Sequence, residues 1–246
     1  MSVDVATVWY TTTALVVTAF VGLVFGPWFK DLWIRPKLRI AFKFGVGSVC
    51  SHQTKMEKTV GEKGKEKTLS YKVYYFAFVV RNKGGSHAED CEAILEGAWK
   101  TENGERVGQN LMPIPVNFIW APGGSENRIL KTISRNGRRL CNIGHIEPKE
   151  YQPLSSCRDF HDTEQGMNRF LFELPRNQHF YYQWDCLLPG EYLLLVSTYA
   201  RNAKKVAKEF RVRWSGKWSD REKEMFENIT MCCSKARWGL WKDCMP

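Results

Sequence analysis

Residues 71–81 read YKVYYFAFVVR, and the tetrapeptide Asn82-Lys83-Gly84-Gly85 follows them directly. The run is dense in aromatic and β-branched residues, which favour strands over helices. Asn and Gly are typical of tight turns, because they tolerate the backbone angles that turns require. We therefore predict a largely buried strand that ends in a turn, with the returning strand at residues 91–99.

Similar patterns recur on both sides of this strand. Residues 38–44 alternate apolar and mostly basic side chains, with the period of two that a half-buried strand requires. The polar residues 52–68 lack an apolar period and indicate a solvated loop. Short apolar runs between Gly, Pro and Asn turns predict further strands at residues 116–120, 140–145, 170–174, 192–200 and 209–214.

The order of these elements predicts the fold class. No helix-length pattern separates the strands, so an antiparallel immunoglobulin-like β-sandwich over residues 36–218 is favoured over a βαβ fold. The turn Pro189-Gly190 precedes Tyr192, whose hydroxyl is placed to hydrogen-bond back across a tyrosine corner. An ordinary Pro-Gly turn before a strand explains the same residues. The overall prediction is mainly β, with a helix at each end of the sandwich.

The N-terminal region predicts a membrane anchor over residues 1–35. Residues 5–29 carry no charge and would span ~37 Å as a helix, enough for a ~30 Å hydrocarbon core. A cleaved signal peptide would need basic residues before the apolar run, and none is present. A buried core helix is rarely apolar on every face. Aromatic rings at the two predicted interfaces suit a spanning helix: Trp9, Tyr10, Trp28 and Trp33.

The charges that flank the anchor predict its orientation. Only Asp4 precedes it, whereas the basic residues Lys30, Arg35 and Lys37 follow within a few positions. By the positive-inside rule, the N-terminus lies outside the plasma membrane and the C-terminal domain is cytoplasmic. The whole chain has 36 Lys and Arg against 26 Asp and Glu. We expect anionic lipid head groups to be the partner of this excess, and nucleic acid binding to be unlikely because no nucleic-acid-binding motif is present.

Small residues recur at every fourth position of the anchor: Ala14, Thr18, Gly22 and Gly26. Such a stripe permits close packing between spanning helices, and it predicts a protein partner or a homo-oligomer. Alternatively, these glycines are only common residues of membrane helices. The eight cysteines show no regular spacing, which favours reduced thiols in a cytoplasmic domain over a disulfide framework in an exported one.

Residues 219–246 predict a C-terminal amphipathic helix and tail. Ser219 and Glu222 have the spacing of a capping box at a helix N-terminus. Apolar residues along one face of this helix would either pack on the sandwich or dock on a partner or in the lipid interface. The pattern leaves these alternatives open. The apolar positions that define one helical face are Met225, Phe226, Ile229, Cys232, Cys233 and Ala236.

Several segments together carry a family resemblance: the anchor followed by RPKLRI, then VVRNKGGSHAEDCEAIL, GEYLLLVSTYARNAK and FRVRWSGKW. The whole chain resembles a group of uncharacterised prokaryotic single-pass membrane proteins. Their soluble part is similar to the cell-adhesion-related bacterial domain, an immunoglobulin-like sandwich. The motifs are structural, and the resemblance implies fold and topology without catalytic residues.

The sequence contains no recognisable catalytic motif. The five histidines show no metal-ligand spacing, and the chain lacks a nucleophile elbow and a Walker A loop. His161-Asp162 has the residue types of a base and its orienting group but lies in a polar loop. We therefore expect no enzyme and no cofactor, and predict a membrane-tethered binding or scaffold module. The alternatives are an exported adhesion or carbohydrate-binding domain, and an enzyme whose site has no recognisable motif.

Overall fold

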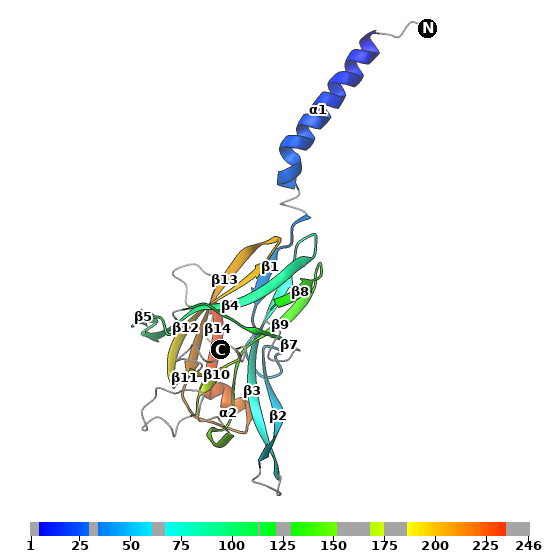
Figure 1. Cartoon of the computed structure of the whole chain (residues 1–246). Helices are drawn as coiled ribbons and strands as arrows, with labels where there is room; N and C mark the ends of the chain where they lie inside the picture. Colours follow the sequence, from blue (N-terminus) through cyan, green and yellow to red (C-terminus); the bar gives the residue numbers. More distant parts are fainter. Residues whose placement is uncertain are drawn as a thin grey trace.

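The computed structural model describes residues 5–29, 34–60, 67–112, 114–121, 129–151, 168–174 and 186–234. Helix α1 (Val5–Phe29) projects away from a body of two β-sheets, as Figure 1 shows. None of its window Trp9–Gly26 is buried against the rest of the protein, and the mean hydropathy of that window is 1.5. The predicted helix is confirmed as long and apolar enough to cross a membrane.

The first sheet, sheet A, contains seven antiparallel strands. Strand β3, which includes the aromatic run, is its centre and pairs with β1, β2 and β9. The bounds of the strands of sheet A are β1 (Leu38–Ala41), β2 (Ser51–Val60), β3 (Lys67–Asn82), β7 (Ile119–Ala121), β9 (Arg138–Ile146), β10 (Phe170–Phe172) and β11 (Cys186–Leu187).

The second sheet, sheet B, also contains seven strands, in the order β14-β13-β12-β4-β5, with β6 and β8 paired to β4. Two short helices complete the described structure, the 3-10 helix η2 (Lys149–Tyr151) and α2 (Glu222–Asn228). The bounds of the strands of sheet B are β4 (Ala88–Glu102), β5 (Glu105–Val107), β6 (Val116–Asn117), β8 (Ile129–Ile133), β12 (Gly190–Ala200), β13 (Ala203–Trp214) and β14 (Ile229–Ser234).

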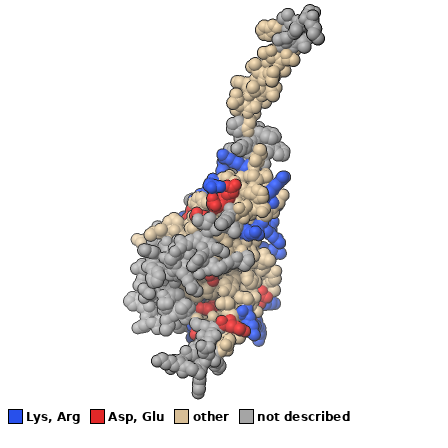
Figure 2. Space-filling view, turned by 45° about the vertical axis from the view of Figure 1, so that its right-hand side comes forward, with Lys and Arg blue, Asp and Glu red and all other residues tan. Residues whose placement is uncertain are grey.

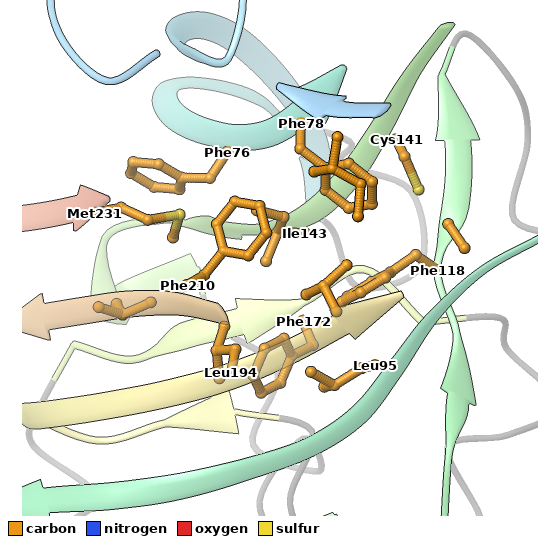
Figure 3. Packing of buried hydrophobic residues seen from close by; sticks show 14 of the residues in the cluster. Phe76, Phe78, Leu95, Phe118, Cys141, Ile143, Phe172, Leu194, Phe210 and Met231 are labelled. Carbon is orange, nitrogen blue, oxygen red and sulfur yellow. The ribbon is translucent and has the colours of Figure 1, made fainter. Parts of the chain in front are cut away.

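One hydrophobic core lies between the two sheets. Figure 3 shows Phe76 and Phe78 of sheet A facing Leu194 and Phe210 of sheet B. The rings of Phe78 and Phe210 are 5.8 Å apart, and Phe78 meets Phe118 edge-on at 5.9 Å. These side chains are fully buried, and each large apolar side chain stabilises the fold by about 1.5–3 kcal/mol. The predicted antiparallel sandwich is confirmed.

Two expectations about the first strands are wrong. Residues 52–60 and 67–68 are not a solvated loop, because Ser51–Val60 pairs along its whole length with β3, and residues 61–66 lie outside the described residues. This ribbon extends beyond the core, so its side chains are polar and the apolar period of a half-buried strand is missing. The expected returning strand, β4, does not pair with β3 at all. It crosses to sheet B, so the Asn82–Gly85 turn connects the two sheets.

The C-terminal prediction is right for about two helix turns and wrong for residues 229–234, and residues 235–246 lie outside the described residues. Helix α2 ends at Asn228, and residues 229–234 form edge strand β14. Ile229 and Met231 are buried with the period of two, which the stripe of helical spacing concealed. Ser219 is not the helix cap: Arg221 occupies that position, and the Ser219 hydroxyl bonds Glu224 and the Arg221 amide. Met225 and Phe226 are buried in the main core, as the packing alternative predicted.

Candidate functional site

The predicted packing stripe lies on a helix that has no neighbours within the described chain. The Thr18 hydroxyl donates to the Ala14 carbonyl oxygen at 2.8 Å, so its polar group is satisfied inside the helix. Apart from the backbone of α1 itself, no atom of the described residues lies within 4 Å of a Cβ built at Gly22 or Gly26. The stripe is therefore smooth and open, with room for another helix to approach closely.

The structure describes some of the predicted membrane-interface residues and not others. Trp9 and Tyr10 are highly exposed on the first turns of α1. Trp28 lies within α1 and its side chain is outside the described residues, as are Lys30 and Trp33. Arg35 and Lys37 are exposed where the chain enters sheet A. Both lie within three positions of the first residue of β1, which is at the end of the sandwich that faces α1 (Figure 1).

That proximal end is held together by one buried side chain. Asn82, the last residue of β3, is 0% exposed. Its Oδ1 accepts hydrogen bonds from the amides of Lys37 and Gly84 at 3.1 and 3.0 Å. Its Nδ2 donates to the carbonyl oxygens of Ser86 and Ile133 at 2.7 and 3.1 Å. Asn82 thus fastens the segment that follows α1 to the turn after β3 and to the end of β8 in sheet B.

Gly84 completes this junction through its lack of a side chain. A Cβ at position 84 would lie 2.2 Å from the Arg35 carbonyl oxygen and 2.4 Å from the Lys37 nitrogen. Backbone atoms cannot yield as a flexible side chain does, so only glycine fits here. The Asn-x-Gly pattern was visible in the sequence as a turn signal. Its role in clamping the anchor segment depends on contacts that are distant in sequence.

The predicted corner residue Tyr192 lies near the start of β12 and is 6% exposed. Its ring packs beside Gly190, where an added Cβ would meet the Tyr192 ring and hydroxyl at 3.3–3.5 Å. Tyr192 therefore lies beside the turn that precedes its strand. The hydrogen bond across the corner stays a prediction.

The opposite, distal end contains an open cleft of about 650 Å³. Tyr71 stacks on Tyr151 of η2 with ring centroids 4.1 Å apart, and its hydroxyl donates to Glu147 Oε2 at 3.1 Å. Trp218 meets Tyr74 edge-on at 5.3 Å. The polar groups that line the cleft include Gln53, Lys55, Ser70, Lys72, Glu150 and Asp220. Stacked rings with adjacent donors and acceptors suit ligand binding.

The tyrosines of β3 near this cleft keep their protons at neutral pH. Burial, followed by the negative charge of Glu147, raises the pKa of Tyr71 to about 12. Burial also raises the pKa of Tyr74 and of Tyr75 to about 12. A neutral phenol donates a hydrogen bond but does not serve as a base at physiological pH. These residues therefore favour binding over proton transfer.

The outer face of sheet B carries a charged network centred on Glu96. Its carboxylate accepts hydrogen bonds from the hydroxyls of Ser197 at 2.7 Å and Tyr199 at 2.5 Å, and it pairs with Lys205. Burial raises the pKa of Glu96, but these hydrogen bonds and the Lys205 charge outweigh burial and lower it overall. The network ties β4, β12 and β13 together and leaves Glu96 ionised.

The cysteines and metal-capable residues do not form a reactive cluster within the described residues. No three of the His, Cys, Asp and Glu groups in these segments converge on a point where they could hold a metal ion. Burial raises the pKa of the Cys141 thiol well above its usual range, which keeps it protonated and unreactive. Cys186 is disulfide-bonded, whereas Cys50, Cys91, Cys141, Cys232 and Cys233 form no disulfide. His161-Asp162 lies outside the described residues.

No protein-family model, curated protein or solved structure matches this chain. The resemblance to single-pass membrane proteins with an immunoglobulin-like domain therefore stays a prediction. Sequence reasoning missed the distal cleft, because its rings come from β3, η2 and the segment before α2. The only local signal was the aromatic density of residues 71–81 and the tryptophan at position 218.

Proposed function

We propose that this protein is a membrane-tethered, non-catalytic binding or scaffold module that presents its distal cleft to a partner. The observation that carries the proposal is helix α1, which is apolar on all faces and has none of its window Trp9–Gly26 buried. Such a surface is unfavourable in water and requires a bilayer or other spanning helices. The proximal junction supports the tether role, since Asn82 and Gly84 fix the chain that leaves the anchor.

The proposed location is the plasma membrane, with the sandwich on the cytoplasmic side. The basic residues after the anchor support this orientation, because Lys and Arg are retained on the cytoplasmic face. The five cysteines of the described residues that form no disulfide also suit a reducing compartment. A partner helix on the small-residue stripe would make the protein a subunit of a larger membrane assembly.

A second candidate function rests on one specific observation. Cys186 is disulfide-bonded, and disulfides persist mainly in exported proteins. An exported sandwich with an aromatic cleft suits adhesion or carbohydrate binding, since sugar rings pack on aromatic faces. The flanking charges outweigh the single disulfide in our proposal, and the compartment of the sandwich distinguishes the two functions.

The tether is tested by alkaline carbonate extraction of membranes. Val17→Arg with Val21→Arg places two charges near the centre of α1, each of which costs about 2.5–3.5 kcal/mol in a bilayer. We expect this variant in the soluble fraction, and both the wild type and the Val17→Leu, Val21→Leu control in the membrane pellet. A double-arginine variant that pellets like the wild type would contradict the tether.

The assembly is tested by site-directed crosslinking from Thr18 in native membranes. Gly22→Leu with Gly26→Leu fills the open stripe, so a crosslinked species present in the wild type should disappear. Val21→Leu with Phe25→Leu changes another face of α1 and should leave that species unchanged. An identical pattern in all three proteins would mean that α1 anchors the domain without a packed partner.

A further inference from the structure

The proximal end of sheet A carries basic residues aligned across its strands. Arg39 of β1 is directly opposite Arg81 of β3, and Arg81 is opposite Arg138 of β9. All three are exposed, whereas Leu38 and Ile40 on either side of Arg39 face the core. The Lys83 amide donates to the Lys37 carbonyl oxygen at 2.8 Å, so these two lysines form a further basic pair next to the three aligned arginines. We name these five residues the basic ladder.

This alignment is unfavourable for the domain alone. Like charges directly opposite one another destabilise a pair of strands. Within the described part of the chain, no ion pair involves Arg39, Arg81 or Arg138. The nearby carboxylates of Glu89 and Asp90 are paired with Arg201 instead. Among the described residues, these three arginines therefore have no ion-pair partner that the fold supplies.

The geometry of the ladder suits phosphate groups. Neighbouring strands place the three arginines about 4.8 Å apart. Each guanidinium presents a planar fork that binds phosphate oxygens through paired hydrogen bonds. Asn82 and the β3–β9 pairing hold the ladder rigidly, so little conformational entropy is lost on binding.

The position of the basic ladder near α1 indicates that the phosphate belongs to a lipid. Lys37 lies eight positions after Phe29, the last residue of α1, which limits that distance to ~28 Å. Figure 2 shows several Lys and Arg on the part of the sandwich next to α1, with one group of Asp and Glu beside them. The distal segment 217–227 mixes three basic residues with four acidic ones and offers no such excess. We propose that the basic ladder binds anionic phospholipid head groups and docks the sandwich against the bilayer.

This inference rests on the proposed tether, and one experiment separates the two. The full chain is reconstituted in nanodiscs of phosphatidylcholine, with or without phosphatidylglycerol, and labelled with a soluble amine reagent. We expect Lys83 to react roughly fivefold more slowly in the anionic discs, with Lys217 at the distal end unchanged. High salt should remove the difference, because exposed charges are screened. Co-elution of the protein with the nanodisc tests whether α1 is inserted in the bilayer, independently of whether the sandwich docks on the lipid.

Matched variants assign the effect to the ladder. Arg39→Gln, Arg81→Gln and Arg138→Gln together should abolish the protection of Lys83. The control, Arg213→Gln, Arg221→Gln and Lys223→Gln, removes the same charge from the distal end and should retain it. In detergent without anionic lipid, the ladder variant should melt at or above the wild-type temperature, since repulsion is relieved.

Three results would overturn the proposal. Equal Lys83 reactivity in both kinds of disc would mean that the domain does not dock on anionic lipid. Protection that survives in the ladder variant would assign docking to other residues. Protection by added duplex DNA or RNA in phosphatidylcholine discs, without protection by phosphatidylglycerol, would identify the ladder as a nucleic-acid site.

Discussion

The two ends of the sandwich are built from different interactions. At the proximal end, the buried Asn82 side chain makes four hydrogen bonds to backbone groups, and Gly84 lies against the backbone of residues 35–37. At the distal end, Tyr71, Tyr151 and Trp218 are half-buried and meet through ring contacts. Buried backbone hydrogen bonds permit few substitutions, whereas half-buried rings permit many. The domain therefore has a fixed connection to the segment that follows α1 and a distal surface that tolerates more substitutions.

The largest loss of stability is expected from a substitution at the proximal end. Asn82→Ala removes four hydrogen bonds and leaves buried amides and carbonyls unpaired, which should lower the free energy of unfolding by about 3 kcal/mol. Tyr71→Phe at the distal end removes one partly buried hydrogen bond, to Glu147, and should lower the free energy of unfolding by no more than about 1 kcal/mol. Urea unfolding of the full chain in detergent measures both. Equal losses would remove the distinction between the two ends.

A slightly smaller effect is expected at Gly84. Gly84→Ala forces a methyl group into the backbone of residues 35–37 and should cost about 2–3 kcal/mol. Gly108→Ala is the control, since no atom lies within 4 Å of its Cβ and only its positive φ of 75° opposes the change. That conformation costs about 1–2 kcal/mol. The same unfolding experiment would refute the close approach if Gly84→Ala proved the milder substitution.

The sequence predicted what depends on local pattern and missed what depends on position in the sheet. The uncharged residues 5–29 and the run that became β3 were identified correctly, because an uncharged run of helix length and a dense run of aromatic and β-branched residues are both direct local patterns. Strand β2 was missed, since both of its faces are polar where the ribbon leaves the core. Ile229, Cys232 and Cys233 fit a helical stripe as well as a strand, and only pairing with β13 decides between them. The basic ladder depends on register, which a single sequence does not reveal.

A moderate effect is expected at Tyr192, which lies at the same end of β12 as the distal turn Pro189-Gly190. If its hydroxyl bonds across the corner, Tyr192→Phe should lower the free energy of unfolding by about 1 kcal/mol. The ring remains in place, so packing is preserved and the loss reports the hydroxyl alone. Identical thermal melts of the two proteins would identify an ordinary turn.

The smallest effect appears only at high pH. The pKa values of Tyr71, Tyr74 and Tyr75 are about 12 in the folded protein, against about 10 in an unfolded chain. Their contribution to stability is complete below pH 10 and is lost as the pH rises through 12. Phenolate absorbance should therefore show a late transition that Tyr75→Phe reduces. A single transition near pH 10 for all nine tyrosines would contradict the burial of these three.

The central claim is that α1 holds the sandwich on the cytoplasmic face of the membrane. Its most direct test is a reporter active only in the cytoplasm, fused after Pro246 and compared with a reporter active only after export. We predict activity of the cytoplasmic reporter, and a weaker bias when Lys30, Arg35, Lys37 and Arg39 are made neutral. Activity of the exported reporter alone would contradict the account and favour an extracellular binding domain.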